Sequence, residues 1–124
     1  MLNDITEKII GCSIKVYKKL GPGFLESVYQ KALAYEMNKI NLKFEKEKIL
    51  PVKYDDIILN IGFRCDFLVE NKVIIECKAV KEITKLDKAQ IINYLKITDL
   101  QVGLLINFNV LKLKEGLNRI VNNY

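Results

Sequence analysis

The first forty residues repeat apolar side chains at helical spacing. An amphipathic helix is predicted over residues 5–20 and a second over residues 24–40. Asp4 with Glu7 predicts a capping box at the start of the first helix, and Gly21-Pro22 predicts its end. The expected apolar positions are Ile5, Ile9, Cys12, Val16 and Leu20 in the first helix and Leu25, Val28, Tyr29, Ala32, Leu33 and Met37 in the second.

From residue 48 the pattern changes to that of strands. Strands are predicted over residues 49–54, 57–69 and 73–79. Asp55-Asp56 separates the first two strands, and Glu70-Asn71-Lys72 separates the second from the third. Both spacers are rich in turn-favouring residues, so we expect two consecutive hairpins.

The last third of the chain contains one more helix and at least one more strand. Thr84 with Asp87 predicts a capped helix start, and the helix should reach Thr98 with Ala89, Ile92 and Leu95 facing inward. Residues 102–108 form a nearly continuous apolar run, which is typical of a strand covered on both faces. Residues 110–121 remain ambiguous because Gly116 weakens either assignment. The order ααβββαβ predicts an α/β fold with a mixed central sheet flanked by helices.

Composition fits one folded domain over residues 1–124. Half of the residues are hydrophobic and 28% are charged, so the chain can bury a core. No apolar run approaches the roughly 18 residues that span a bilayer, and the polar N-terminus does not resemble a signal peptide. We therefore expect a cytoplasmic protein with no membrane partner. Its three cysteines, Cys12, Cys65 and Cys77, should be reduced and buried.

The net charge of +5 permits a polyanionic partner but is weak evidence for one. Eighteen of the twenty basic residues are lysine, and the chain is also rich in isoleucine and asparagine. Such a bias can reflect codon usage rather than a ligand. A structural zinc site is not expected, because the chain has no histidine and no closely spaced pair of cysteines.

The second predicted hairpin brings two acids together. If residues 70–72 form a three-residue loop, Asp66 faces Glu76 with their Cβ atoms about 4.5–5.5 Å apart. The strand period of two places Lys78 on the same face as Glu76, whereas Cys77 points to the other face. Two interpretations are open: a solvated face on which Lys78 neutralises one acid, or a site for Mg²⁺ or Mn²⁺ with oxygen ligands.

The arrangement of Asp66 with Glu76-Cys77-Lys78 resembles the D…(D/E)-x-K signature of the PD-(D/E)XK nuclease superfamily. Residues 20–29, which read LGPGFLESVY, resemble the motif that names the GxxExxY proteins within it. The likeness runs in the same order over nearly the whole chain and implies a restriction-endonuclease-like fold. Further matches are Ala34-Tyr35-Glu36, residues 62–66, Ala89-Gln90 with Tyr94-Leu95, and residues 103–108.

The resemblance implies a set of site residues. Asp66 and Glu76 correspond to metal ligands, and Lys78 to the residue beside the attacking water. Glu26 matches an acid on the second helix that completes such a site, although an acid in a first helical turn also interacts favourably with the helix dipole. Gln90 is expected at the edge of the site. Tyr94, one turn further on, is expected to pack with its hydroxyl satisfied.

The implied function is hydrolysis of nucleic-acid phosphodiester bonds with Mg²⁺ or Mn²⁺, and the sequence does not separate DNA from RNA. The alternative is a non-catalytic module that keeps the nuclease fold and binds nucleic acid or other proteins. A chain with no added recognition domain also fits a homodimer or a larger complex. Three departures from the family pattern stand out: Cys65 stands where the superfamily has proline, Tyr17 where relatives often carry histidine, and Asp87-Lys88 where they often carry His-Glu.

Overall fold

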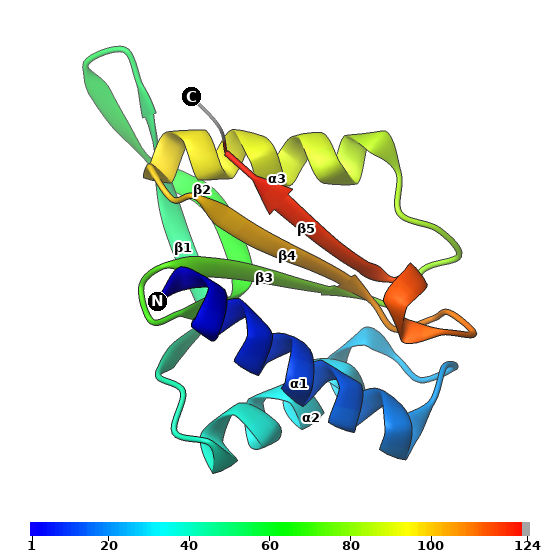
Figure 1. The fold of residues 1–124 in the computed structure, drawn as a ribbon. Helices are drawn as coiled ribbons and strands as arrows, with labels where there is room; N and C mark the ends of the chain where they lie inside the picture. Colours follow the sequence, from blue (N-terminus) through cyan, green and yellow to red (C-terminus); the bar gives the residue numbers. More distant parts are fainter. Residues whose placement is uncertain (123–124) are drawn as a thin grey trace.

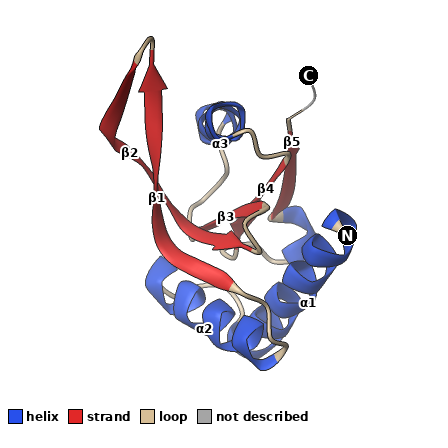
Figure 2. Cartoon of the chain, turned by 90° about the vertical axis from the view of Figure 1, so that its left-hand side faces the viewer, coloured by secondary structure: helices blue, strands red, loops and turns tan. Residues whose placement is uncertain are grey.

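A five-stranded sheet lies between a pair of helices on one face and a single helix on the other (Figures 1 and 2). The computed structural model describes residues 1–122, apart from the side chains of Asn60, Ile61 and Phe63. The elements in chain order are α1 (Leu2–Leu20), α2 (Glu26–Lys39), β1 (Phe44–Tyr54), β2 (Ile57–Val69), β3 (Val73–Lys78), α3 (Lys85–Thr98), β4 (Val102–Asn107), the 3₁₀ turn η1 (Leu113–Glu115) and β5 (Leu117–Val121).

The strands follow one another across the sheet in the order β1-β2-β3-β4-β5. The β3–β4 pair is parallel because α3 crosses over between these strands, and the other three pairs are antiparallel. This architecture confirms the predicted α/β class with a mixed sheet flanked by helices. No helix within residues 1–122 is both long enough and apolar enough to cross a membrane.

Two apolar cores hold the layers together. The larger one joins α1 and α2 to the sheet and includes buried Ile9, Val16, Leu33, Met37, Phe67, Ile75 and Ile106. The smaller one lies under α3 and consists of Leu50, Cys65, Leu68, Ile74, Ile91 and Leu95. Cys12 and Cys77 belong to the larger core, and all three cysteines are free and buried, as predicted.

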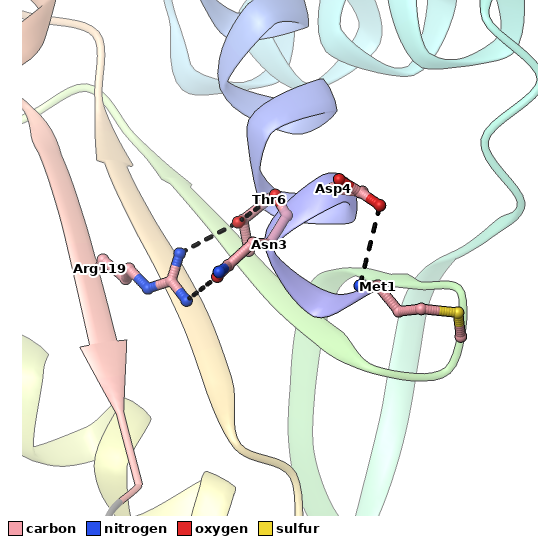
Figure 3. Close-up of polar contacts among 5 residues, drawn as sticks. All are labelled: Met1, Asn3, Asp4, Thr6 and Arg119. Carbon is pink, nitrogen blue, oxygen red and sulfur yellow. Dashed lines mark hydrogen bonds and ion pairs between the residues drawn. The ribbon is translucent and has the colours of Figure 1, made fainter.

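The start of α1 differs from the prediction. The helix begins at Leu2 with no side-chain cap, so the expected capping box of Asp4 and Glu7 is wrong. Instead, Arg119 of β5 donates hydrogen bonds to Thr6 Oγ1 and Asn3 Oδ1, each 3.0 Å long (Figure 3). Asp4 lies 3.8 Å from the N-terminal ammonium. The first turn is thus anchored by a strand at the far end of the chain, which a local capping rule does not include.

Two residues expected in helical cores are exposed. Leu25 is 75% exposed because it precedes α2 in an extended conformation, outside the helical face. Ala89 is exposed on α3, where Ile91 and Leu95 are the buried positions. The predicted cap of α3 is confirmed by two reciprocal hydrogen bonds that join Thr84 and Asp87.

The C-terminal segment resolves into η1 and β5, and Gly116 lies between them. A Cβ atom at this position would be 1.9 Å from the carbonyl oxygen of Asn107. The residue that weakened both sequence assignments is therefore needed for close contact between two backbone segments. At the opposite edge of the sheet, β1 begins at Phe44, earlier than predicted, and the β1–β2 ribbon extends well beyond the other strands (Figure 2).

Candidate active site

The β2–β3 hairpin has the predicted register. Its paired positions include Val69 with Val73 and Phe67 with Ile75. The three-residue loop closes with a 2.9 Å hydrogen bond from the Lys72 N–H group to the Val69 carbonyl oxygen. The pairing ends just before Asp66 on one strand and Glu76 on the other.

Beyond this point, hydrogen bonds to side-chain carboxylates replace the backbone-to-backbone hydrogen bonds between the two strands. The Asp66 N–H group donates to Glu76 Oε1 at 2.9 Å, and the Cys77 N–H group donates to Asp66 Oδ2 at 2.7 Å. Each carboxylate therefore satisfies a backbone donor of the opposite strand, in a charge-assisted hydrogen bond. The two acids lie opposed, as the hairpin register predicts, and each keeps a second oxygen outside these two bonds.

The opposed acids lie in a poorly hydrated environment. Glu76 is 9% exposed, and its pKa is raised to about 8, first by burial and then by the charge of Asp66. Burial also raises the pKa of Asp66, although the hydrogen bond from Cys77 opposes this shift. Lys78 at the end of β3 lowers both pKa values without cancelling the effect of burial. The site is therefore short of positive charge, which favours the protonated form of Glu76.

The segment between α1 and α2 presents Glu26 to these acids. Tyr29 is fully buried, and its hydroxyl donates to the Gly21 carbonyl oxygen at 2.6 Å and accepts from the Phe24 N–H group at 3.2 Å. Its ring stacks on Phe108 with centroids 4.5 Å apart. Gly21 has φ 67°, a conformation that favours glycine. The tyrosine thus fixes the loop, and Glu26 opens α2 one turn earlier.

Glu26 is electrostatically coupled to the acids of the sheet. Its pKa is raised first by burial and next by the charge of Asp66, whereas the charge of Lys78 lowers it. Glu26 also belongs to the acids whose charge raises the pKa of Glu76. The structure therefore brings Asp66, Glu76, Lys78 and Glu26 together, as the resemblance implies.

Gln30 is a member of this group that the sequence analysis did not identify. Its Nε2 donates to Glu26 Oε1 at 3.3 Å, and a hydrogen bond from Gln30 also lowers the pKa of Asp66, against the larger effect of burial. Gln30 therefore connects the helical acid to the sheet acid. The signal that could have revealed it is its spacing, because a residue four positions after Glu26 shares its helix face.

Gln90 lies apart from these contacts. It is exposed on α3, which covers the opposite face of the sheet from α2 (Figure 2). It takes no part in the hydrogen bonds that join Gln30 and the acids, so its place at the edge of the site stays a prediction. Tyr94 packs against the smaller core, in agreement with its expected packing role.

The donor set suits a hard cation such as Mg²⁺ or Mn²⁺. Carboxylate oxygens are the preferred ligands of these ions, and a cation would relieve the repulsion that raises the pKa of Glu76. Within residues 1–122, no three acidic or cysteine side chains approach closely enough to enclose a metal by themselves. Mg²⁺ is commonly held by only one or two carboxylates and keeps several water ligands, so a pair of acids such as Asp66 and Glu76 could hold it without a third protein ligand.

Comparison with known proteins agrees with the geometry. Residues 3–120 match the family model described as PD-(D/E)XK nuclease superfamily. Neither the curated proteins nor the solved structures contain a significant match to the chain. The family match covers every residue of the candidate site, including the opposed acids, Lys78 and Glu26. The chain therefore belongs to the PD-(D/E)XK nuclease superfamily.

Proposed function

We propose that this protein is a Mg²⁺- or Mn²⁺-dependent nuclease of the GxxExxY type that hydrolyses phosphodiester bonds in DNA or RNA. The observation that carries the proposal is the pair of opposed carboxylates of half-buried Asp66 and buried Glu76, with Lys78 two positions along the same strand as Glu76. Two acids held this close lower stability when both are charged, and this arrangement is useful where a cation and a phosphate bind.

The roles of the residues follow from their chemistry. Asp66 and Glu76 hold the ion with the oxygens left outside their backbone hydrogen bonds. When bound, the ion polarises a phosphoryl oxygen and lowers the pKa of water. The Lys78 ammonium orients the attacking water and offsets the negative charge that grows in the transition state. Glu26 holds a further water or ion, and Gln90 contacts the substrate at the edge of the site.

The reaction is a hydrolysis that needs no other reactant. The water oxygen forms a bond to phosphorus, the ester P–O bond breaks, and the products are a phosphate monoester and a hydroxyl group. Lysines on the surface bind neighbouring phosphates without sequence preference, so affinity should fall as salt rises.

Cleavage assays with a paired lysine control test this proposal. The wild type, Lys78→Ala and Lys72→Ala proteins are each incubated with single- and double-stranded DNA and RNA in the presence of Mn²⁺ or Mg²⁺, and their cleavage rates are compared. Lys72 lies in the exposed β2–β3 loop, so its loss removes an equal charge away from the acids. We expect Lys78→Ala to lower the rate by about 10²-fold or more and Lys72→Ala to leave it unchanged. Equal rates in all three proteins would contradict the proposal.

The alternative is a module that binds nucleic acid without cutting it. It is favoured by one observation, namely that Asp66 and Glu76 already satisfy backbone donors and so have a structural role with no cation. Mn²⁺ titration separates the two functions. Saturable Mn²⁺ binding that Asp66→Asn weakens supports the nuclease, whereas nucleic-acid binding with no such Mn²⁺ site and no cleavage supports the module.

A further inference from the structure

A polar hollow opens outside the carboxyl ends of β3 and β4, the parallel pair of the sheet. Its volume is about 330 Å³, at the lower end of the range for small-molecule sites. Ligands of open α/β sheets commonly bind outside the carboxyl ends of parallel strands. The polar residues that line this hollow are Lys81, Glu82, Lys88, Asn107, Glu115 and Asn118.

The floor of the hollow is built by a hydrogen-bonded asparagine. Asn107 is 2% exposed, and its Oδ1 accepts from the N–H groups of Val80 and Asn109, each at 3.1 Å. Its Nδ2 donates to the Val80 carbonyl oxygen at 2.9 Å. These bonds tie the loop after β3 to the end of β4. Gly116 then packs against the Asn107 backbone where no side chain would fit. The floor of the hollow is therefore held by the protein's own hydrogen bonds, which lowers the entropic cost of ordering this part on binding.

The hollow adjoins the candidate active site through one pair of neighbouring residues. Lys78 and Asn107 are register partners on β3 and β4, and the Phe108 N–H group donates to the Lys78 carbonyl oxygen at 3.0 Å. Lys78 therefore ends the strand directly beside the floor of the hollow. A nucleic-acid strand held at Lys78 can place its neighbouring nucleotide in the hollow.

The lining combines both signs of charge. Lys81 and Lys88 can bind an anionic group, whereas Glu82 and Glu115 accept hydrogen bonds. The Asn118 side chain donates to the carbonyl oxygens of Leu105 and Gly116, at 3.2 and 3.1 Å, so its Oδ1 is not used in those bonds. A matching ligand must therefore carry an anion together with N–H or O–H donors. A nucleotide has this combination, since its phosphate is anionic and its sugar and base carry donors.

We propose that this hollow is the subsite for the nucleotide next to the phosphate that is cleaved. The phosphate of that nucleotide binds Lys81 and Lys88, and the donors of its sugar and base face Glu115 and Asn118. Its position in a cleavage reaction rests on the proposed nuclease function. Nucleotide binding in the hollow does not require cleavage, so the two can be tested separately.

The test is an NMR titration of ¹⁵N-labelled protein with each of the four nucleoside 5′-monophosphates, in the absence of divalent metal. We expect the amide signals of residues 81–83 and the Asn118 side chain to shift. The double variant Lys81→Ala/Lys88→Ala should weaken binding about 10-fold or more, as expected when charge-assisted hydrogen bonds are lost. The matched control Lys8→Ala/Lys18→Ala removes the same charge from exposed positions of α1 and should bind like the wild type.

Three results would overturn the subsite. The first is that Lys8→Ala/Lys18→Ala weakens nucleotide binding as much as Lys81→Ala/Lys88→Ala does. The second is that the signal shifts are confined to residues outside the hollow. The third is that the hollow binds a zwitterionic amino acid such as glycine but no nucleotide. Cleavage assays on the same variants distinguish this failure from failure of the nuclease proposal. A nuclease that binds no nucleotide in the hollow refutes only the subsite. Nucleotide binding in a protein that cleaves nothing supports the hollow as a nucleotide site and refutes the nuclease.

Discussion

Glu36 and Glu76 are both buried acids, but their surroundings are opposite. Glu36 of α2 is 4% exposed and lies 3.2 Å from Lys19 Nζ of α1 and 3.7 Å from Lys39 Nζ. The hydrogen bond from Lys19 is the main cause that lowers the pKa of Glu36. Glu76 is 9% exposed, and its pKa is raised to about 8 by burial and by Asp66. Glu36 is therefore paired with two lysines, whereas Glu76 lies opposite another acid, Asp66.

The difference separates an acid that supports the fold from one that is suited to binding. The ion pair with Lys19 joins α1 to α2, and the ion pair with Lys39 lies within α2, so the charge of Glu36 favours the folded state. The charge of Glu76 opposes folding, because burial and the charge of Asp66 both disfavour it. Ionisable groups whose environment raises or lowers their pKa strongly are concentrated at functional sites, and here the direction of the shift carries the information.

The largest expected difference between the two acids is in activity. Glu76→Gln should lower the cleavage rate by at least about 10²-fold, because it replaces a charged carboxylate at the reacting centre with a neutral amide. Glu36→Gln should leave the rate per folded molecule unchanged. The measurement is Mn²⁺-dependent cleavage normalised to the folded fraction from circular dichroism. The comparison fails if both variants lose activity to the same extent.

Stability should show the reverse order. Glu36→Gln should lower the melting temperature by several degrees in metal-free buffer, because Lys19 and Lys39 lose their partner. Glu76→Gln should leave the melting temperature unchanged or raise it, because the amide removes a repelling charge. Differential scanning fluorimetry at pH 8 measures both. A large fall for Glu76→Gln would mean that the hydrogen bond that the Glu76 carboxylate accepts from the Asp66 N–H group outweighs the repulsion.

The pH dependence of stability sharpens the same contrast. Because the pKa of Glu76 rises from 4.5 to about 8 on folding, the folded state holds a proton that the unfolded state has lost between these values. Stability should therefore fall as pH rises from about 4.5 to 8. The lowered pKa of Glu36 has the opposite sign and costs stability in acid. Melting curves from pH 5 to 8.5 measure the slope, which Glu76→Gln should flatten. An unchanged slope in that variant would contradict the assignment.

The smallest expected effect concerns the helical side of the site. Gln30→Ala should weaken Mn²⁺ binding by about 10-fold, the lower end of the range for residues that orient metal ligands. Asn38→Ala, at an exposed position of the same helix, is the control. Isothermal titration calorimetry gives the dissociation constants without any need for activity. Equal affinity in both variants would show that Gln30 does not orient the site.

The sheet acids were predictable because the information is local. A three-residue loop fixes which residues oppose one another, and Asp66 and Glu76 lie only ten positions apart. The cap of α3 was predictable for the same reason, since Thr84 and Asp87 share one helical turn.

The features that the sequence analysis missed depend on contacts between distant segments. The first turn of α1 is bound by Arg119, more than one hundred residues away, and this contact has no local signature. Glu36 matched a family motif but was indistinguishable from an exposed helical charge until Lys19 of α1 was placed beside it. Gln30 could be recognised as a site residue only from the packing of α2 against the sheet. Its two partners, Glu26 and Asp66, belong to different layers.

The stack of Tyr29 on Phe108 also bears on how the molecule opens. Proteins expose their amides through cooperative units that open with different free energies. Glu26 and Gln30 belong to the helical pair, whereas the opposed acids belong to the sheet, so separation of these layers would dismantle the site before the chain unfolds. The stack couples α2 to the residue after β4 across that boundary. Amide hydrogen exchange in α2 reports the free energy at which the helix that carries Glu26 and Gln30 opens.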